Sequence, residues 1–335
     1  MSNKILVIYN TCALYEKEAK AEAWIDQLKS ILTQDIINDC KVVHSDCGTH
    51  PKYRTRIKEY FENDISYYHT PEALPIQATC NHATKKMVEA YGEFETYLYL
   101  GAGITFAHNA QLEVAYKILT ANSNKLSKLD FHVSRPPELP PAEELHPPFD
   151  FYNYLETSND HYYALRPGQR VNNHTAMFTN LHFKSYGDRL LPDAYNGNGA
   201  ESIYPYLASA LNRQHGVLSF KHGGSLFHEP DHDGANQFLP LTSGEQRRSY
   251  FYNWAFRNEE GHLEELNEKG LEFGLQTDVP NNEMCQRQMP RKEFNQDGLP
   301  MDEKHKQALL DLLLEYVFLD ESKLNYEEIE NTFTK

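Results

Sequence analysis

The chain has 335 residues, of which 40% are hydrophobic and 24% are charged, a composition typical of a globular protein with one large domain or two smaller ones. Its formal net charge of −16 argues against extended nucleic acid and against an anionic membrane surface as partners, because both require clustered Lys and Arg. No stretch approaches the roughly 20 apolar residues of a membrane helix, so no membrane span is expected.

The five cysteines include no CxxC pair, and neither a disulfide framework nor a zinc ribbon is expected. A reducing compartment, the cytoplasm, is the favoured location.

The first 125 residues or so alternate between segments of strand and helix length. Strands are expected at 5–9, 41–44, 65–69 and 97–100, and helices at about 15–33, 53–62, 81–91 and 109–119. This alternation predicts an α/β fold with a mostly parallel, Rossmann-like sheet and helices on both faces. Ligands bind such sheets beyond the carboxyl ends of the strands. Three segments at strand ends are therefore candidate ligand contacts: Tyr9–Thr11, Ser45–Thr49 and Gly101–Gly103.

The later part of the chain is less regular. Six prolines fall between 135 and 150, which predicts an extended connector or a long surface loop. Residues 151–235 are rich in Tyr, Asn, Gly and His. Beyond 237 the chain becomes acidic, with an apolar helical face near its end, which predicts a helical C-terminal extension.

Several motifs follow one another in a familiar order. They are Leu28-Lys29-Ser30-Ile31-Leu32-Thr33-Gln34 at the end of a helix, Asp46-Cys47-Gly48-Thr49 after a strand, and Asn81 opening a helix before Gly92. In this order the chain resembles the glycosyltransferase-A superfamily, most closely its family-2-like branch. The likeness covers 4–125 well and 170–235 loosely.

The resemblance implies a donor site for a nucleotide sugar, with a UDP-sugar as the expected donor and a glycan or another hydroxyl compound as the acceptor. Tyr9, Asn10 and Thr11 would line the base and ribose, and Asp46 would accept a hydrogen bond from either. Asn81 and the Gly101–Gly103 segment would complete the donor site. Simpler alternatives remain, because Asp46 could cap a loop and Asn81 could cap a helix.

One departure from the family is serious. Where the family has Asp-x-Asp, which binds Mn²⁺ or Mg²⁺, this chain has Gly101, Ala102 and Gly103. Glycines supply no side-chain oxygen for a divalent cation. Three explanations follow in order of preference: metal-independent catalysis, a metal held elsewhere, or a binding module without turnover.

A second group of chemically active residues runs from His222 to Asp233 and contains three histidines. The family often places a histidine near this point, and His222 and His228 are the candidates for contacting a metal or the diphosphate. Without a full zinc-binding spacing, a polar loop that satisfies its own turns is the alternative.

The resemblance also implies a general base for the acceptor hydroxyl. Glu201, after a Gly-rich segment, is the first choice, and Asp193 is the reserve. Glu201 could instead only stabilise a helix N-terminus by its charge.

The leading hypothesis is therefore an inverting glycosyltransferase, a hexosyl- or pentosyltransferase. The alternatives are a metal-dependent hydrolase that uses the 222–233 cluster, and a catalytically inactive glycosyltransferase-like binding protein. The expected organisation is a nucleotide-sugar-binding half at 1–125, a connector with the acceptor-binding and catalytic half at 126–235, and the helical extension at 236–335.

Overall fold

The structure of the chain is a computed structural model. It describes residues 3–11, 20–70, 76–131, 133–134, 154–156, 161–165, 175–193, 204–220, 226–228 and 330–332, together with residues 307, 310, 311, 313, 314 and 318. Within these residues no helix is long and apolar enough to cross a membrane.

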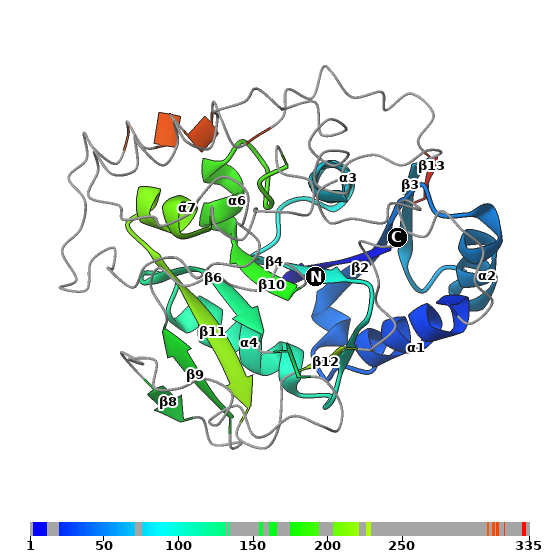
Figure 1. Cartoon of the computed structure of the whole chain (residues 1–335), viewed down its shortest axis with the longest axis horizontal. Helices are drawn as coiled ribbons and strands as arrows, with labels where there is room; N and C mark the ends of the chain where they lie inside the picture. Colours follow the sequence, from blue (N-terminus) through cyan, green and yellow to red (C-terminus); the bar gives the residue numbers. More distant parts are fainter. Residues whose placement is uncertain are drawn as a thin grey trace, which may run out of the picture.

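A ten-stranded sheet forms the centre of the molecule, in the order β13-β3-β2-β1-β4-β10-β6-β11-β9-β8 (Figure 1). The strands β1, β2, β3, β4, β6 and β11 all run in one direction, and β10 lies antiparallel between β4 and β6. The bounds are β1 Ile5–Thr11, β2 Cys40–Cys47, β3 Ser66–Thr70, β4 Thr96–Gly101, β6 Leu126–Phe131, β8 Tyr154–Glu156, β9 His161–Leu165, β10 Thr175–Thr179, β11 Gln214–Phe220 and β13 Glu330–Thr332.

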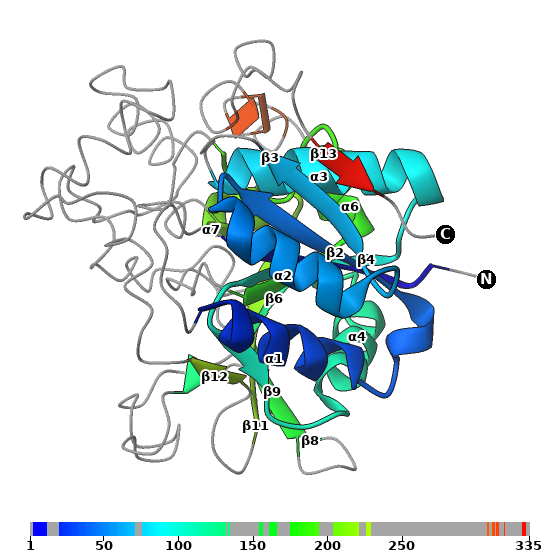
Figure 2. The same ribbon diagram turned by 90° about the vertical axis from the view of Figure 1, so that its right-hand side faces the viewer.

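Helices cover both faces of this sheet. On one face lie α1 (Lys20–Leu32), α2 (Pro51–Phe61) and α4 (Gln111–Ala121), and on the other lie α3 (Ile76–Tyr91), α6 (Asn180–Ser185) and α7 (Tyr204–Ala210). Figure 2 shows α1 and α2 side by side in front of the strands. A short 3-10 helix, η1 (Ile37–Asp39), leads into β2.

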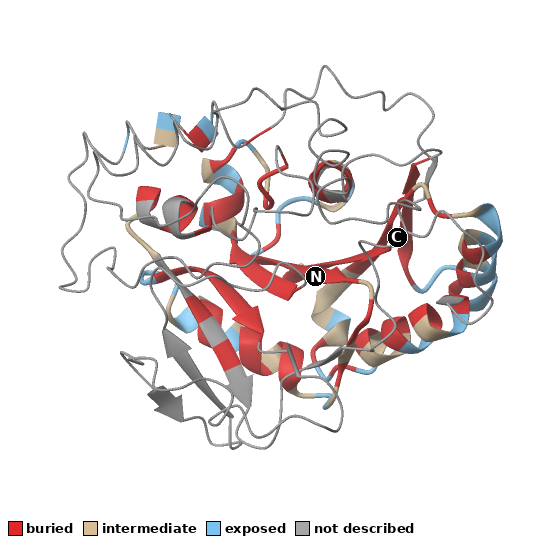
Figure 3. Cartoon of the chain, in the orientation of Figure 1, coloured by how far each residue is buried: buried red, intermediate tan, exposed pale blue. Residues whose placement is uncertain are grey.

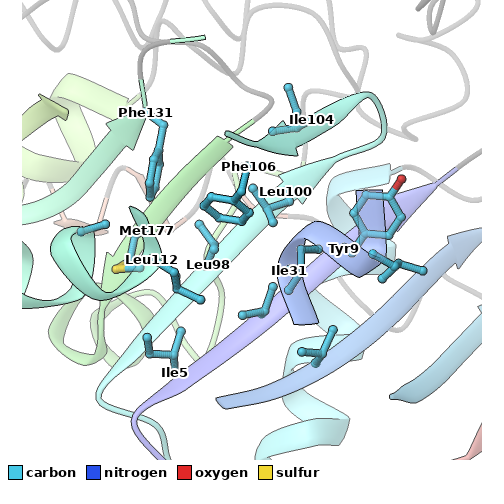
Figure 4. Close-up of a cluster of buried hydrophobic side chains, with 14 of the residues drawn as sticks. Ile5, Tyr9, Ile31, Leu98, Leu100, Ile104, Phe106, Leu112, Phe131 and Met177 are labelled. Carbon is cyan, nitrogen blue, oxygen red and sulfur yellow. The ribbon is translucent and has the colours of Figure 1, made fainter. Parts of the chain in front are cut away.

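The two faces of the sheet bury separate hydrophobic clusters (Figure 3). Alternate residues of β1 enter each: Leu6 and Ile8 pack toward α3, whereas Ile5, Val7 and Tyr9 pack toward α1 (Figure 4). A strand covered on both sides must be apolar at every position, and this explains the continuous apolar run of β1.

A second, three-stranded sheet has the order β5-β12-β7. It combines β5 (Ile104–Phe106), directly after β4, with β12 (Leu226–His228) and β7 (Val133–Ser134). This small sheet therefore joins parts of the sequence that are more than 100 residues apart.

The predicted fold class is confirmed, with two corrections to element boundaries. The helix expected at 81–91 begins at Ile76, because buried Ala78 and Cys80 extend its apolar face by a turn; Asn81 therefore lies inside α3 and opens no helix. The strand expected at 41–44 continues to Cys47, because hydrogen-bonded polar side chains at its end are buried between its neighbours.

Most of the acidic C-terminal extension lies outside the described residues. Of its described part, Gln307, Leu310, Asp311, Leu313 and Leu314 are helical. Residues 330–332, however, form the strand β13 at the edge of the large sheet beside β3, so the prediction of a wholly helical extension is wrong at this point. Leu313 and Phe318 belong to the cluster on the α3 face.

Candidate functional site

The candidate donor residues of β1, β2 and β4 lie at one edge of the large sheet. The strands are parallel, and their register places Thr11 opposite Asp46 and Asn10 opposite Gly101. Because parallel strands end at the same edge, segments that are separated by roughly 35 to 91 residues in the sequence, from the pairing above, meet at the carboxyl ends of the strands.

On the α1 and α2 face, a chain of hydrogen bonds runs across these strand ends. Thr11 Oγ1 donates to Asp46 Oδ1 at 3.2 Å and lies 2.7 Å from His44 Nε2. His44 Nδ1 lies 3.3 Å from Nε2 of His69. All four side chains are fully buried.

The number of available protons assigns the donor and the acceptor of each hydrogen bond in this series. The Thr11 hydroxyl has a single proton, which it donates to Asp46, so His44 must donate its Nε2–H to Thr11. Nδ1 of the neutral His44 ring then accepts from Nε2–H of His69. Nδ1 of His69 has no hydrogen-bond partner among the described residues. Both imidazoles are thus neutral when Asp46 is ionised.

Burial governs the charges of this group. It lowers the pKa of His44 to about 3, with Lys58 and Arg54 of α2 adding to the effect. Burial also lowers the pKa of His69, reinforced by His44. It raises the pKa of Asp46 to about 6, against the opposing effects of the Thr49 hydrogen bonds and of Arg54.

The Asp46 carboxylate is already used within the protein. Its Oδ2 accepts from the backbone N–H of Thr49 at 3.1 Å, and Arg54 Nε lies 3.9 Å away. The first of these contacts is the loop-capping interaction that the sequence offers as the simpler alternative. Together with the Thr11 hydroxyl, these contacts use most of the roughly four acceptor positions of the carboxylate, and the Asp46 side chain is fully buried.

Gln27 of α1 connects two of the candidate donor residues, and sequence reasoning missed it. Its Oε1 accepts from the Tyr9 hydroxyl and, at 2.9 Å, from the backbone N–H of Gly103. Gln27 and Tyr9 are fully buried. The signal in the sequence is a glutamine within the apolar face of the helix, between Trp24 and Leu28.

We expect Gln27→Met to lower the free energy of unfolding by about 2 kcal/mol, since two buried donors lose their acceptor. Gln34→Met is the matched control. Gln34 is also a buried glutamine, but it joins the end of α1 to Leu112 and His108, remote from β1. Urea titration should show a loss for both variants. If the strand ends bind a nucleotide, as the resemblance implies, only the Gln27 variant should weaken that binding, and equal weakening in both would contradict the assignment.

The Gly101–Gly103 segment forms the turn between β4 and β5. Gly103 has φ +94°, a conformation that favours glycine. The turn has no carboxylate, and the described residues contain no group of three or more His, Cys, Asp or Glu side chains that could hold a metal ion. The described part of the site therefore does not fit the divalent cation that the fold family implies.

The small sheet brings His228 to this turn. β12 pairs antiparallel with β5, and the register places His228 opposite Ile104, the residue after Gly103. The backbones of His228 and of the residue after the Gly101–Gly103 turn are thus neighbours, although roughly 120 residues separate them in the sequence, by the pairing above. His222, Asp231, His232 and Glu201 lie outside the described residues.

On the α3 face, Asn81 and Asp193 are in direct contact. The Asn81 Nδ2 donates to Asp193 Oδ2 at 2.9 Å, and both side chains are 1% exposed. The structure thus brings together a predicted donor-site residue, Asn81, and the reserve candidate for the general base, Asp193. Asn81 makes this contact from the interior of α3 and not from the first turn of a helix.

The structure describes three cysteines, Cys40, Cys47 and Cys80, and none of them forms a disulfide with another described residue. Burial raises the pKa of Cys40 to about 12 and raises that of Cys80 well above its usual value. The thiols of Cys40 and Cys80 are therefore protonated and unreactive at neutral pH.

No protein-family model and no curated protein matches this sequence. Among solved structures, the chain is similar to the mannosyltransferase PcManGT from Pyrobaculum calidifontis in complex with GDP-Man and Mn²⁺, at 14% identity and a TM-score of 0.47, over 95% of this chain and 72% of that one. It is similar to GalNAc-T7 with UDP, GalNAc and Mn²⁺ at 9% identity and a TM-score of 0.50, over 94% of this chain and 57% of that one.

A putative nucleotide-diphospho-sugar transferase from Desulfovibrio desulfuricans G20 matches at 9% identity and a TM-score of 0.33, over 59% of this chain and 69% of that one. At such identities the similarity concerns the fold alone, and the match to GalNAc-T7, with its TM-score of 0.50, is the one that supports it. This chain spans little more than half of GalNAc-T7. The chain has a glycosyltransferase-A-like fold, as its sequence predicts.

Proposed function

We propose that this protein transfers a sugar from a nucleoside-diphosphate sugar, in the first place a UDP-sugar, to an acceptor hydroxyl. The observation that carries the proposal is the convergence of Asn10, Thr11, Asp46 and the Gly101–Gly103 turn on one edge of the sheet, in a glycosyltransferase-A-like fold. GalNAc-T7, which shares the fold, was solved with UDP.

In this proposal the residues at the strand ends hold the nucleoside. Asp46 accepts a hydrogen bond from the base or the ribose. Asn10 lies at the same ends of the strands but on the opposite, α3 face of the sheet, where it donates to the Ser45 carbonyl at 3.1 Å. Tyr9 and Asp46 are both fully buried; we assign Tyr9 a supporting role because its hydroxyl already donates to Gln27. The half at 1–125 would bind the donor, and the half at 126–235 would bind the acceptor.

The reaction would be a direct displacement with inversion. A carboxylate, Glu201 or Asp193, takes the proton of the acceptor hydroxyl, the oxygen attacks the anomeric carbon, and the diphosphate leaves with the bonding electrons. In this proposal basic side chains or backbone N–H groups stabilise the leaving group, and a metal held by residues outside the described ranges is the alternative. The N–H of Gly103 is excluded from this task, since Gln27 accepts its hydrogen bond.

A second candidate function is donor binding without turnover. The observation that favours it is the turn itself, in which two glycines and an alanine replace the family's carboxylates. The metal-dependent hydrolase has no such support, because its candidate ligands other than His228 lie outside the described residues. It remains an outcome of the test.

The test is the thermal stability of the chain with a panel of nucleoside diphosphates and nucleotide sugars, each with Mn²⁺, with Mg²⁺ and with a chelator. A ligand at 100 times its Kd should stabilise the fold by about 2.7 kcal/mol. We expect one nucleotide sugar to do so in the presence of chelator. The variant Asp46→Asn should weaken this response, whereas Asp39→Asn, just before the start of the same strand, should not.

The remaining outcomes separate the alternatives. Release of free diphosphate nucleotide in a coupled assay distinguishes transfer from binding alone. Stabilisation by metal without a response to any nucleotide would contradict the donor site and favour the hydrolase.

A further inference from the structure

Four buried side chains at the ends of β1, β2 and β3 are joined in series by hydrogen bonds. The series runs from Asp46 through Thr11 and His44 to His69. Thr11, Asp46 and His69 lie in one row across the three parallel strands. Each of the four side chains is 0% exposed, so solvent does not compete for these hydrogen bonds.

Each link of this series can run in either direction. A hydroxyl both donates and accepts, and a neutral imidazole donates from one ring nitrogen and accepts at the other, in either of two tautomers. With Asp46 ionised, every proton of the series points toward the carboxylate, and both rings carry their proton on Nε2. Nδ1 of His69 is then a bare acceptor at the far end, with no hydrogen-bond partner among the described residues.

A protonated Asp46 is a donor and requires an acceptor of its own. At Oδ2 it meets two donors, the backbone N–H of Thr49 and the Nε of Arg54. At Oδ1 the Thr11 hydroxyl can accept, provided that it donates in turn to Nε2 of His44. The Thr49 side chain, which is also hydrogen-bonded to Asp46, is the alternative acceptor.

We propose that these four groups form a two-state proton relay, in which the uptake of one proton reverses all three hydrogen bonds and changes the tautomer of both imidazoles. The inference concerns a pH-sensitive device at the strand ends and does not depend on the transfer reaction. Its two states differ by the charge of Asp46 at one end of the series and by the position of the ring proton of His69 at the other.

The step balances one proton against one carboxylate charge. A proton from a hydronium ion of the solvent forms an N–H bond at Nδ1 of His69, and the Nε2–H proton of this ring passes to Nδ1 of His44. The Nε2–H proton of His44 passes to Thr11 Oγ1, whose own proton passes to Asp46 Oδ1. Each ring gains one proton and loses another, so both rings are neutral at the end and the carboxylate charge is neutralised.

The charges around the relay favour neutral rings in both states. Burial, together with Lys58 and Arg54 of α2, lowers the pKa of His44 to about 3 and also lowers that of His69, to which His44 contributes. Burial raises the pKa of Asp46 to about 6, against the Thr49 hydrogen bonds and Arg54. A proton taken up near pH 6 therefore resides on the carboxyl group and not on a ring.

Two tyrosines and the edge strand complete the surroundings. The Tyr9 ring lies 6.0 Å from that of His44, and its hydroxyl donates to Gln27. The Tyr67 ring lies 5.6 Å from that of His69, and its buried hydroxyl has no partner among the described residues. Burial raises the pKa of Tyr67, so this hydroxyl stays protonated and suits either state of Nδ1, as a donor or as an acceptor. On β13, Glu330 lies opposite His69 in the register.

The tautomers can be measured directly by NMR. In long-range ¹H–¹⁵N correlation spectra of the chain labelled with ¹⁵N-histidine, the protonated and the bare ring nitrogen have separate shifts. Between pH 7.5 and pH 5 we expect His44 and His69 to change together from the Nε2–H form to the Nδ1–H form, with a midpoint at about 6. The ¹³C shift of the Asp46 carboxyl group should have the same midpoint, and amide spectra at each pH show whether the chain remains folded.

His182 is the internal control in the same spectra. It is also buried, but its Nε2 lies 3.0 Å from the Leu190 carbonyl, which can only accept. His182 should therefore keep its Nε2–H form at every pH.

Three variants locate the relay. Thr11→Val removes the hydroxyl between His44 and Asp46, so the tautomers of both histidines should no longer change with pH. Asp46→Asn removes the titrating group and should have the same effect. Thr70→Val is the matched control, because the Thr70 hydroxyl is buried and bonds to the main-chain carbonyl of Asp46 at 3.2 Å, outside the series; its spectra should respond to pH as those of the wild type do.

The outcomes are distinct from those that test the proposed function. Protonation of Asp46 in the wild type without a change of tautomer would overturn the relay and assign the proton to the Thr49 side. A change of tautomer that persists in Asp46→Asn would overturn it as well, since the rings would then titrate on their own. All spectra are recorded without nucleotide, so failure of the relay leaves the proposed function standing, and absence of sugar transfer leaves the relay standing.

Discussion

Replacement of Lys128 by methionine is expected to lower the free energy of unfolding by about 3–5 kcal/mol at pH 7.5, because it leaves a buried carboxylate without its counter-ion. Lys128 Nζ lies 2.5 Å from Asp130 Oδ1, and each side chain is 2% exposed. The ammonium group also lies 3.7 Å from the centre of the Tyr204 ring in α7. Asp130 Oδ2 has no hydrogen-bond partner among the described residues, so few other groups would stabilise its charge.

The cost of this variant should depend on pH. Burial raises the pKa of Asp130 to about 6, and Lys128 opposes the shift. Without Lys128 the carboxyl group will protonate more readily, and a protonated group does not need the counter-ion. Chemical denaturation should therefore show a smaller cost at pH 5 than at pH 7.5.

Two further variants serve as controls. Lys128→Met/Asp130→Leu should recover most of the lost stability, since no charge remains buried. Lys117→Met breaks the exposed pair with Glu113 and should cost about 0.5 kcal/mol or less. A cost for Lys128→Met that stays constant with pH and persists in the double variant would show that lost packing, and not the stranded charge, is responsible.

Acidification from pH 7 to pH 5 should lower the free energy of unfolding by about 3 kcal/mol through five buried groups. Burial lowers the pKa of His44 and of His182 to about 3 and also lowers that of His69. Each histidine stays neutral in the folded state while it takes up a proton in the unfolded state. Each therefore favours unfolding, by about 2 kcal/mol over this range.

Asp46 and Asp130 act in the opposite direction. Burial raises the pKa of each to about 6, so the folded state takes up the protons first. Their stabilising contribution is present at low pH and is lost as the pH rises through 6. Between pH 7 and pH 5 each carboxyl group therefore offsets about 1.4 kcal/mol of the stability that the histidines lose. The free-energy contribution of the three histidines exceeds that of the two carboxyl groups, so the free energy of unfolding should rise between pH 5 and pH 7.

Urea titrations at half-unit pH intervals measure this slope. The variant His182→Gln removes one buried imidazole and should flatten the slope, whereas His50→Gln, at the exposed start of α2, should leave it unchanged. A stability that falls between pH 5 and 7 would mean that the carboxyl groups dominate.

Much of the donor half can be predicted from the sequence because its signals are local. β1 and β4 are apolar runs of strand length, and the helices between them show regular spacing of buried residues. The corrected boundaries, those of β2 and α3, lie where a polar residue is buried by contacts with residues distant in the sequence. Asp46 lies in a strand because β1 and β3 flank it. Asn81 lies inside α3 because the buried Ala78 and Cys80 extend the helix before it, and its side chain is bonded to residues about 110 positions away.

The residues that sequence reasoning missed share this property. Lys128, Gln27 and the His44–His69 pair resemble ordinary polar positions until the strands and helices around them are placed. The partners of Gln27 and of the two histidines come from other elements of the fold, and no local pattern specifies them. Lys128 and Asp130 lie two residues apart in β6, so only the burial of this pair depends on the surrounding strands and helices. The contact of His228 with the strand after Gly103 likewise depends on a pairing between strands far apart in sequence.

The place of β10 has a consequence for how the chain folds. This strand lies at the centre of the sheet, between β4 and β6, although it begins about 44 residues after β6 ends (roughly, from the strand bounds). Until residues 175–179 leave the ribosome, β4 presents an open edge, and such edges are prone to pair with other chains. Contacts this distant in sequence slow folding. A fragment of residues 1–125 should accordingly aggregate instead of folding as an autonomous unit. Folding of the complete sheet during synthesis therefore depends on residues 175–179, which cover the open edge of β4.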